Sequence, residues 1–421
     1  MTLRFSHFLP PMLAALAMAV AAAAPAGSAI AAGRVTAAAF GAVPDDGRVD
    51  GAALQAAIDR LAASGGGTLS LPKGRFVLER SLYLRSGVAV VGAGAATVLT
   101  TEGGSPAPHW RATAVFAGNM MAPSFAENGG RGYAPLPVAG WSERTLRLGD
   151  CRGRSLPEAG DVVWIASADG YAGAGGFLRP DWGRITAVTE RRGCRIVLAD
   201  PLDAPAGTAL TLGHADGSIT DPGREPILPI ANARLANLAI DSALGNGLLV
   251  SGCYRCSFEN LVFGRTQRFL ALQAVRHVEV RNVSGTFSRR GIEFAMLASD
   301  TRVAGIKARF EPGATVDRLR PAVRFGENAE GNSVSDGEFL LAGADGGMAL
   351  VQFLRSQNNA VRSVDFRREG GGKRPAGPTV VDSEPEDRGG LTCGNIVADS
   401  FLIERGARTA LASPEGACPG R

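Results

Sequence analysis

The sequence is poor in aromatic residues and in lysine, and it has no long apolar stretch beyond its first 32 residues. Aromatic side chains are 6% of the 421 residues, and the lysines are Lys73, Lys307 and Lys373. A membrane-spanning helix needs about 20 consecutive apolar residues, so the chain beyond its start predicts none. The sequence also contains no motif for nucleic-acid binding. It is instead rich in glycine, which suits many short strands and tight turns.

The positive charge comes almost entirely from arginine. The formal net charge is +4, which is a mild value. An excess of arginine fits an acidic glycan as the partner. It fits equally well a genome that favours arginine codons.

The first 32 residues have the features of a secretory signal peptide. Arg4 and His7 form a weakly basic start, an apolar run follows from Phe8 to Ala24, and Ala29-Ile30-Ala31 offers small residues for cleavage. A membrane anchor is the alternative, but the run is alanine-rich and short of a full span. We therefore expect a secreted or periplasmic protein, with one elongated domain over residues 33–421 and no membrane span after signal removal.

Six cysteines in an exported chain favour disulfides. Proximity in the sequence favours the pairs Cys151–Cys194, Cys253–Cys256 and Cys393–Cys418 among the fifteen pairings that six cysteines allow. The close spacing of Cys253 and Cys256 also occurs in metal sites. Here no second such pair and no nearby histidine completes a zinc site, so we expect no metal.

Residues 40–94 predict a helix that leads into short strands. Asp50 or the glycine beside it caps the helix, and glycines 65–67 end it. Apolar residues recur at helical spacing at Ala53, Leu54, Ala57, Ile58 and Leu61. Alternating segments follow at residues 68–71, 75–78 and 88–91. Such a helix is suited to cover the open end of a β-stack, where backbone groups would otherwise stay unpaired.

The same segment contains several short motifs in a fixed order. They are Phe40-Gly41-Ala42, Asp45-Asp46-Gly47, Gln55-Ala56-Ala57-Ile58-Asp59, Gly65-Gly66-Gly67 and Leu71-Pro72-Lys73-Gly74-Arg75-Phe76. This order resembles the N-terminal signature of the pectate-lyase-like (rhamnogalacturonase/epimerase-like) parallel β-helix family, including its tailspike-type relatives. The resemblance implies an all-β fold, a single-stranded right-handed parallel β-helix. Because the family includes hydrolases, lyases, epimerases and tailspikes, the resemblance does not imply one chemistry.

The C-terminal half repeats with a period of 22–23 residues, which Asn237, Asn260 and Asn282 mark. A period of this length with alternating apolar residues indicates a β-solenoid, in which stacked coils, or rungs, share one core. The three asparagines are then expected to lie above one another at a turn, with their amides hydrogen-bonded along the stack. A catalytic role for them is the alternative.

A second strand in each rung places a column of side chains on the outside of the stack. The column, identified by the apolar residues that flank each member, is Leu249, Ala271, Glu293, Arg324 and Gln352. Rungs are about 4.8 Å apart, so Glu293 and Arg324 should touch. Arg324 could hold a uronate carboxylate, Glu293 could serve as acid or base, and Gln352 could contact the substrate. The alternative is an exposed ion pair worth about 0–1 kcal/mol.

Residues 101–230 depart from the repeat. Alternating segments within them predict a small antiparallel β-module at about residues 140–215, and shorter loops are expected at 311–321 and 367–390. One loop of this insertion is a second candidate site, because aromatic faces pack on sugar rings. Its residues are Asp169, Tyr171, Arg179, Asp181 and Trp182. Ordinary packing of the insertion is the alternative.

Lys307 and Asp181 complete the candidate catalytic residues. Lys307 is the one lysine on a predicted rung, two residues past the asparagine position, and a desolvated lysine can act as a base. A solvated surface lysine is the alternative. A hydrolase needs two carboxylates, and Asp181 is one choice of partner for Glu293.

Motifs of well-known enzymes with this fold are missing. The chain lacks the Asn-Thr-Asp and Gly-His-Gly motifs of polygalacturonase-type hydrolases and the Asp-Pro-His-Asp motif of alginate epimerases, and Arg320 to Arg324 is one residue short of a pectate-lyase motif. Some related lyases use Ca²⁺, but no dense acidic cluster is visible in the sequence, so we expect no cofactor. The leading hypothesis is cleavage of an acidic, uronate-containing polysaccharide by β-elimination or hydrolysis. The alternative is a non-catalytic glycan-binding or matrix protein.

Overall fold

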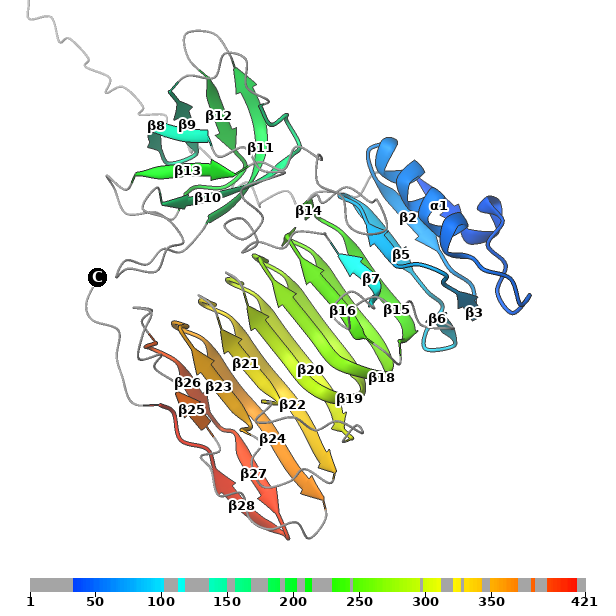
Figure 1. The fold of residues 1–421 in the computed structure, drawn as a ribbon, viewed down its shortest axis with the longest axis vertical. Helices are drawn as coiled ribbons and strands as arrows, with labels where there is room; N and C mark the ends of the chain where they lie inside the picture. The colour runs from blue at the N-terminus through cyan, green and yellow to red at the C-terminus, as the bar shows by residue number, and fades with distance from the viewer. Residues whose placement is uncertain are drawn as a thin grey trace, which may run out of the picture.

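The protein is a parallel β-helix with a small β-barrel beside it (Figure 1). The structure is a computed structural model that describes residues 33–101, 113–117, 136–149, 156–167, 181–189, 194–202, 209–213, 229–242, 245–295, 298–311, 321–326, 329–342, 349–369, 380–382 and 392–414. The predicted β-helix, N-terminal helix and inserted antiparallel module are all confirmed. The predicted signal peptide, residues 1–32, lies outside the described residues.

Three parallel faces make up the stack, and long strands turn from one face to the next. Face A contains β1 (Arg34–Thr36), β2 (Gly67–Ser70), β5 (Val88–Val91), the first parts of β15 (Arg234–Asp241), β18 (Ser257–Gln273), β19 (Glu279–Ala295), β20 (Arg302–Phe310), β22 (Ser333–Ala342) and β24 (Ala360–Glu369), and β26 (Ile396–Ala398). Face B contains β3 (Gly74–Val77), β6 (Thr97–Thr100), the following parts of β15, β18, β19, β20, β22 and β24, then β27 (Phe401–Glu404) and the antiparallel β28 (Ala407–Ala410).

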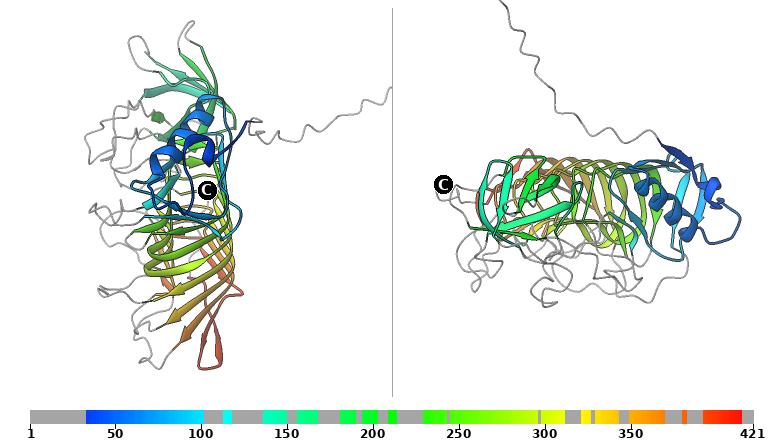
Figure 2. Two further views of the ribbon diagram at one scale, coloured as in Figure 1. Left: turned by 90° about the vertical axis from the view of Figure 1, so that its right-hand side faces the viewer. Right: turned by 90° about the horizontal axis from the view of Figure 1, so that it is seen from above.

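Face C completes each rung. It contains β4 (Leu82–Leu84), β7 (Thr113–Ala117), β16 (Asn246–Ser251), the last parts of β18 and β19, β21 (Val323–Gly326), β23 (Val351–Leu354) and β25 (Val380–Asp382). Beside it, β14 (Ile230–Ala231) pairs with β17 (Cys253–Tyr254). Figure 2 shows the rungs following one another from α1 to β28.

Apolar side chains fill the interior of the stack. The flanking residues of the predicted outer column point inward, and the rings of Phe294, Phe325 and Phe353 stack at centroid distances of 4.8 and 5.2 Å. Burying one such side chain contributes roughly 1.5–3 kcal/mol. Parallel register and interior stacking therefore support each other along the whole stack.

One turn, between faces A and B, has the same left-handed backbone in every C-terminal rung. At Asn237, Asn260 and Asn282, φ is 56°, 54° and 54°, a conformation that asparagine tolerates better than most residues. The Asn260 amide donates to Asn237 Oδ1 at 2.9 Å, and the Asn282 amide donates to Asn260 Oδ1 at 3.2 Å. The predicted asparagine ladder is confirmed.

The same turn position changes chemistry further along the stack. Gly305 holds the next turn position, and the ladder ends there because glycine has no amide side chain. A Cβ at this position would lie 2.6 Å from Asn282 Oδ1. The next members are Asp336, Ser363 and Asp399, with φ of 54°, 54° and 49°. Polar side chains without a ladder therefore line the turn in the last rungs.

A second asparagine ladder lies inside the stack and was not predicted. Asn332, Asn359 and Asn395 are buried, and each of the first two donates its amide to the next member, at 2.9 and 3.0 Å. They also accept backbone N–H groups, so buried polar groups at this corner are satisfied.

The helix α1 (Gly51–Ala63) covers the N-terminal end of the stack, after the short 3₁₀ helix η1 (Ala37–Phe40) (Figure 1). Asp50 is the N-cap residue, but its carboxylate instead accepts from the N–H groups of Val43 and Val77, both at 3.0 Å. Glu79 accepts from the first two N–H groups of the helix, at 2.9 and 3.0 Å. Asp50 therefore stands at the N-cap, as expected, while Glu79 accepts the hydrogen bonds from the first turn.

The inserted module is a closed antiparallel barrel with its own apolar core. Its strands are β8 (Leu136–Ser142), β9 (Thr145–Leu148), β10 (Val162–Ser167), β11 (Asp181–Thr189), β12 (Arg195–Leu198) and β13 (Leu210–Gly213). The barrel is tied to the stack at Asp200, whose carboxylate accepts from the Tyr254 hydroxyl and from Arg255 Nη2, the latter at 2.6 Å.

Two further predictions concern cysteines and loops. Cys253 and Cys256 lie within disulfide-bonding distance, as predicted. Cys194 and Cys393 are also disulfide-bonded, but their predicted partners Cys151 and Cys418 lie outside the described residues. The predicted loop 367–390 is partly strand, because β24 continues to residue 369 and β25 lies within that range. Of the predicted loop 311–321, residues 312–320 lie outside the described part.

Among the described residues, none of the helices has both the length and the apolar character needed to span a membrane.

Candidate functional site

The predicted contact between Glu293 and Arg324 on face C is present, but the column is not exposed. Arg324 Nη1 lies 2.5 Å from Glu293 Oε1, and the two residues are directly paired in β19 and β21. Glu293 is only 2% exposed. The expectation of a solvent-facing ion pair is therefore wrong, because alternation along a strand tells which side a residue faces and not what covers that side.

Further arginines surround Glu293. Arg290 Nη1 lies 2.5 Å from Oε1, and Arg268 Nη1 lies 3.5 Å from Oε2. Burial raises the pKa of Glu293, but Arg290, Arg268 and Arg324 together lower it by more, so the net pKa lies below its usual range. An ionised, buried carboxylate accepts hydrogen bonds but has no proton to give, which suits it poorly to general-acid catalysis.

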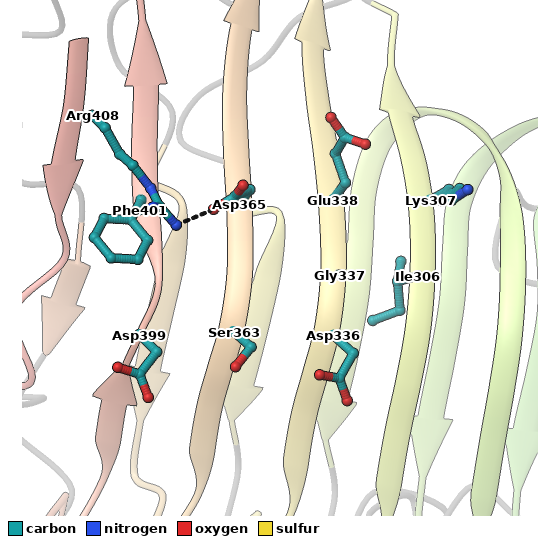
Figure 3. A pocket seen from close by; sticks show the side chains of 10 residues that line it. All are labelled: Ile306, Lys307, Asp336, Gly337, Glu338, Ser363, Asp365, Asp399, Phe401 and Arg408. Carbon is teal, nitrogen blue, oxygen red and sulfur yellow. Dashed lines mark ion pairs between the residues drawn. The ribbon is translucent and has the colours of Figure 1, made fainter.

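A groove opens instead on face B, across the last rungs of the stack (Figure 3). Its volume is about 460 Å³. The lining residues are Ile306, Lys307, Asp336, Gly337, Glu338, Ser363, Asp365, Asp399, Phe401 and Arg408. Four of these residues carry carboxylates and two carry cations, so the groove is acidic.

Strand register builds the floor of the groove. Lys307 pairs with Glu338, Glu338 pairs with Asp365, and Asp365 pairs with Phe401, so these side chains form one outward column. Neighbouring members are separated by about the 4.8 Å spacing of hydrogen-bonded strands. The turn residues Asp336, Ser363 and Asp399 form a second row beside it (Figure 3).

Arginines position both floor carboxylates. Arg367 contacts Glu338 and lies 3.9 Å from Asp365, while Arg408 Nη2 lies 3.6 Å from Asp365. The Arg408 guanidinium also lies 3.6 Å from the centroid of the Phe401 ring, within the range of a cation–π contact. The Glu338 and Asp365 side chains remain 45% and 29% exposed, so both are available to a ligand.

The predicted site residues are spread over three parts of the molecule. Lys307 is exposed, as its alternative interpretation predicted, and lines the groove. Glu293 and Arg324 lie on face C, with the half-buried Gln352 beside Arg324. Asp181 and Trp182 lie in β11 of the barrel, where only their backbone is described.

Asp169, Tyr171 and Arg179 lie outside the described residues. Glu338, Asp365 and Arg408 were not predicted as site residues. A usable signal was present, because Glu338 and Asp365 each stand two residues past the repeating turn, the position at which Lys307 was noticed.

Within the described residues, no three histidine, cysteine or acidic side chains converge as metal ligands. Two of the four groove carboxylates, Glu338 and Asp365, instead have arginine partners.

Comparison with known proteins finds similar solved structures but no family and no curated relative. No protein-family model matches this sequence, and no curated protein matches it. Among solved structures, it is similar to the tailspike protein gp49 from Pseudomonas phage LKA1, at 15% identity over 80% of this chain and 63% of that chain, with a TM-score of 0.40. It is also similar to PfbA, a surface adhesin of Streptococcus pneumoniae, at 10% identity over 89% of this chain and 80% of that chain, with a TM-score of 0.45.

A third similar structure is the A-module of the Azotobacter vinelandii mannuronan C-5 epimerase AlgE4, at 13% identity over 92% of this chain and 100% of that chain, with a TM-score of 0.38. This chain thus spans less than two thirds of the length of the gp49 tailspike. At such identities and TM-scores the similarities transfer no activity and no residue role to this chain.

Proposed function

We propose that this protein binds a glycan along the groove of face B and hydrolyses a glycosidic bond with Glu338 and Asp365. The observation that carries the proposal is the placement of these two carboxylates on adjacent rungs in an open groove. Retaining glycosidases hold their two carboxyl groups about 5–5.5 Å apart. Strands about 4.8 Å apart can present two side chains at that spacing.

The neighbours of the carboxylate pair suit a sugar. Lys307 can donate hydrogen bonds to hydroxyl or ring oxygens, and the turn row Asp336, Ser363 and Asp399 can accept hydrogen bonds from sugar hydroxyls. In a concave binding site, a small number of fixed polar groups sets the orientation of the ligand. The groove therefore offers contacts on both sides of the carboxylates.

The charge of the groove bears on the substrate. Four carboxylates against two cations disfavour an anionic polymer at this place. We therefore propose a neutral or amine-bearing glycan for the groove, in place of the acidic polysaccharide expected from the sequence. The pair of carboxylates also favours hydrolysis over β-elimination, since elimination needs a cation to neutralise a uronate carboxylate and a separate base.

The test is release of reducing ends from a panel of neutral, amino-sugar and uronate glycans by the purified protein. Glu338→Gln and Asp365→Asn are each expected to lower the rate by about 100-fold or more, as loss of an acid or base does, without loss of folding. Glu259→Gln is the matched control, because Glu259 is a half-buried carboxylate paired with Arg234 on face A. Full activity in Glu338→Gln, or no product from any glycan, would refute the hydrolytic function.

The second candidate is glycan binding without turnover. It is favoured by the contacts of Arg367 with both carboxylates and of Arg408 with Asp365, which occupy lone pairs that a catalytic water would need. Binding that weakens in Lys307→Gln, with no product from wild-type protein, would select this candidate. Export of the protein remains a prediction under either function.

A further inference from the structure

We propose that face C carries a second, independent site, which binds an oxyanion through Arg268, Arg289 and Arg290. Arg268, Arg290 and Arg324 surround Glu293, and Arg289 lies close enough to Arg268 to repel it. The site lies on a different face from the acidic groove and is independent of the proposed hydrolysis.

The first observation is an excess of positive charge. Among the described residues, Arg268 and Arg290 form ion pairs with Glu293 alone. Arg289 lies close enough to Arg268 to repel it and has no ion-pair partner in the part of the chain that the structure describes. One carboxylate therefore serves several guanidinium groups.

The second observation is burial. The side chains of Arg268, Arg290 and Arg324 are 18%, 28% and 13% exposed. Like charges that are partly removed from water repel more strongly than solvated ones. In agreement with this, burial lowers the pKa of Arg268, and the neighbouring arginines lower it further, against the opposing effect of Glu293. A bound anion would remove this repulsion.

The third observation is that hydrogen-bonding groups are left over. Nε of Arg289, Nε of Arg290 and Oε2 of Glu293 are buried and have no hydrogen-bond partner among the described residues. The two unpaired Nε–H donors and the excess positive charge call for a further acceptor, whereas Glu293 Oε2 is itself an acceptor and lies 3.5 Å from Arg268 Nη1. The partial exposure of Arg268 and Arg290 leaves a route for a small acceptor to reach them.

The geometry indicates which ligand fits. Arg268 and Arg290 are paired in register on adjacent strands, where like charges directly opposite each other are normally avoided. Two neighbouring guanidinium groups offer planar forks that match carboxylate, sulfate or phosphate oxygens. The next outward residues of face C are apolar, namely Ala271 and Leu249, which pack with Tyr83. The ligand is therefore a compact oxyanion, supplied either by an acidic sugar or by an inorganic ion.

The test measures the melting temperature and the binding isotherm of the full chain against sulfate, phosphate and galacturonate, at constant ionic strength set with chloride. We expect saturable stabilisation of the wild-type protein. Arg268→Gln and Arg289→Gln should each weaken binding by about tenfold or more, since charge-assisted hydrogen bonds are lost. Tighter binding of galacturonate identifies an acidic sugar as the source, and tighter binding of sulfate or phosphate identifies an inorganic ion.

Arg289→Gln also separates binding from folding. Because Arg289 has no ion-pair partner among the described residues, this variant should be at least as stable as wild type without added anion, while losing the response to it. Arg281→Gln, which removes an exposed arginine paired with Glu279 on face A, should keep the full response. Glu338→Gln should keep it too, which makes this result independent of glycan hydrolysis.

The proposal is overturned if wild-type protein shows no saturable response. It is equally overturned if Arg268→Gln and Arg289→Gln respond as Arg281→Gln does.

Discussion

Faces B and C both carry outward columns that include charged residues, yet the two columns treat carboxylates in opposite ways. On face C, Glu293 is 2% exposed and lies among several arginines. On face B, Glu338 and Asp365 keep 45% and 29% of their side-chain surface and line a groove. The backbone supplies the same column spacing in both places. Burial and the ratio of arginines to carboxylates therefore decide whether a carboxylate is enclosed by arginines or stays open to solvent.

The largest expected effect is on the buried side of this comparison. Glu293→Gln removes the carboxylate on which Arg268, Arg290 and Arg324 converge. Breaking a buried ion pair from one side costs about 3–5 kcal/mol, because the partner charges stay buried. We expect a loss of this size in the free energy of unfolding measured with urea.

Partly exposed carboxylates give the matched control for that loss. Glu338→Gln and Glu259→Gln remove partly exposed ion pairs and should change the free energy of unfolding by no more than about 1 kcal/mol. If all three variants lost the same amount, burial would not be what separates the two faces.

The pH dependence of stability sharpens the comparison. The pKa of Glu293 in the folded protein lies below its usual value of 4.5, so the folded state holds its proton less tightly than the unfolded state. Its stabilising contribution is complete above the unfolded pKa and is lost as the pH falls through the folded pKa. Urea midpoints between about pH 3 and pH 7 should therefore fall on the acid side in wild type and fall less in Glu293→Gln.

Asp50 provides the opposite sign. Burial raises its pKa above the usual 3.8, despite the hydrogen bonds from Val77 and Val43 that lower it. Its protonation on acidification favours the folded state, so Asp50 cannot cause the acid-side loss. Parallel curves for wild type and Glu293→Gln would contradict the assignment of that loss to Glu293.

The sequence predicted the features that depend on the repeat alone. The period of 22–23 residues places Asn237, Asn260 and Asn282 in one column, and the same register brings Glu293 to Arg324. Each of these contacts follows once strands pair in parallel with one residue opposite one residue.

Features that depend on contacts between distant segments were not predictable in this way. The burial of Glu293 depends on what lies over face C, and the cap of α1 comes from Glu79, 28 residues after the helix begins at Gly51. The groove needed a further step, since Glu338 and Asp365 are 27 residues apart and become neighbours only through the pairing of β22 with β24. Its carboxylates were visible in the sequence, but their convergence was not.

The smallest expected effect concerns the turn column that runs from the asparagine ladder into the groove. Asn260 and Ser363 have the same φ of 54°, but Asn260 makes two amide hydrogen bonds to its neighbours, whereas Ser363 makes no side-chain hydrogen bond to the described residues. Asn260→Ala should therefore cost about 1–2 kcal/mol in the free energy of unfolding, and Ser363→Ala should cost less than about 0.5 kcal/mol. Asn260→Gly should recover part of the loss, because glycine accepts positive φ without strain. Equal losses at both positions would show that the amide ladder adds nothing to the backbone preference, and that the polar residues of the last rungs are no freer to serve a ligand than those of the first.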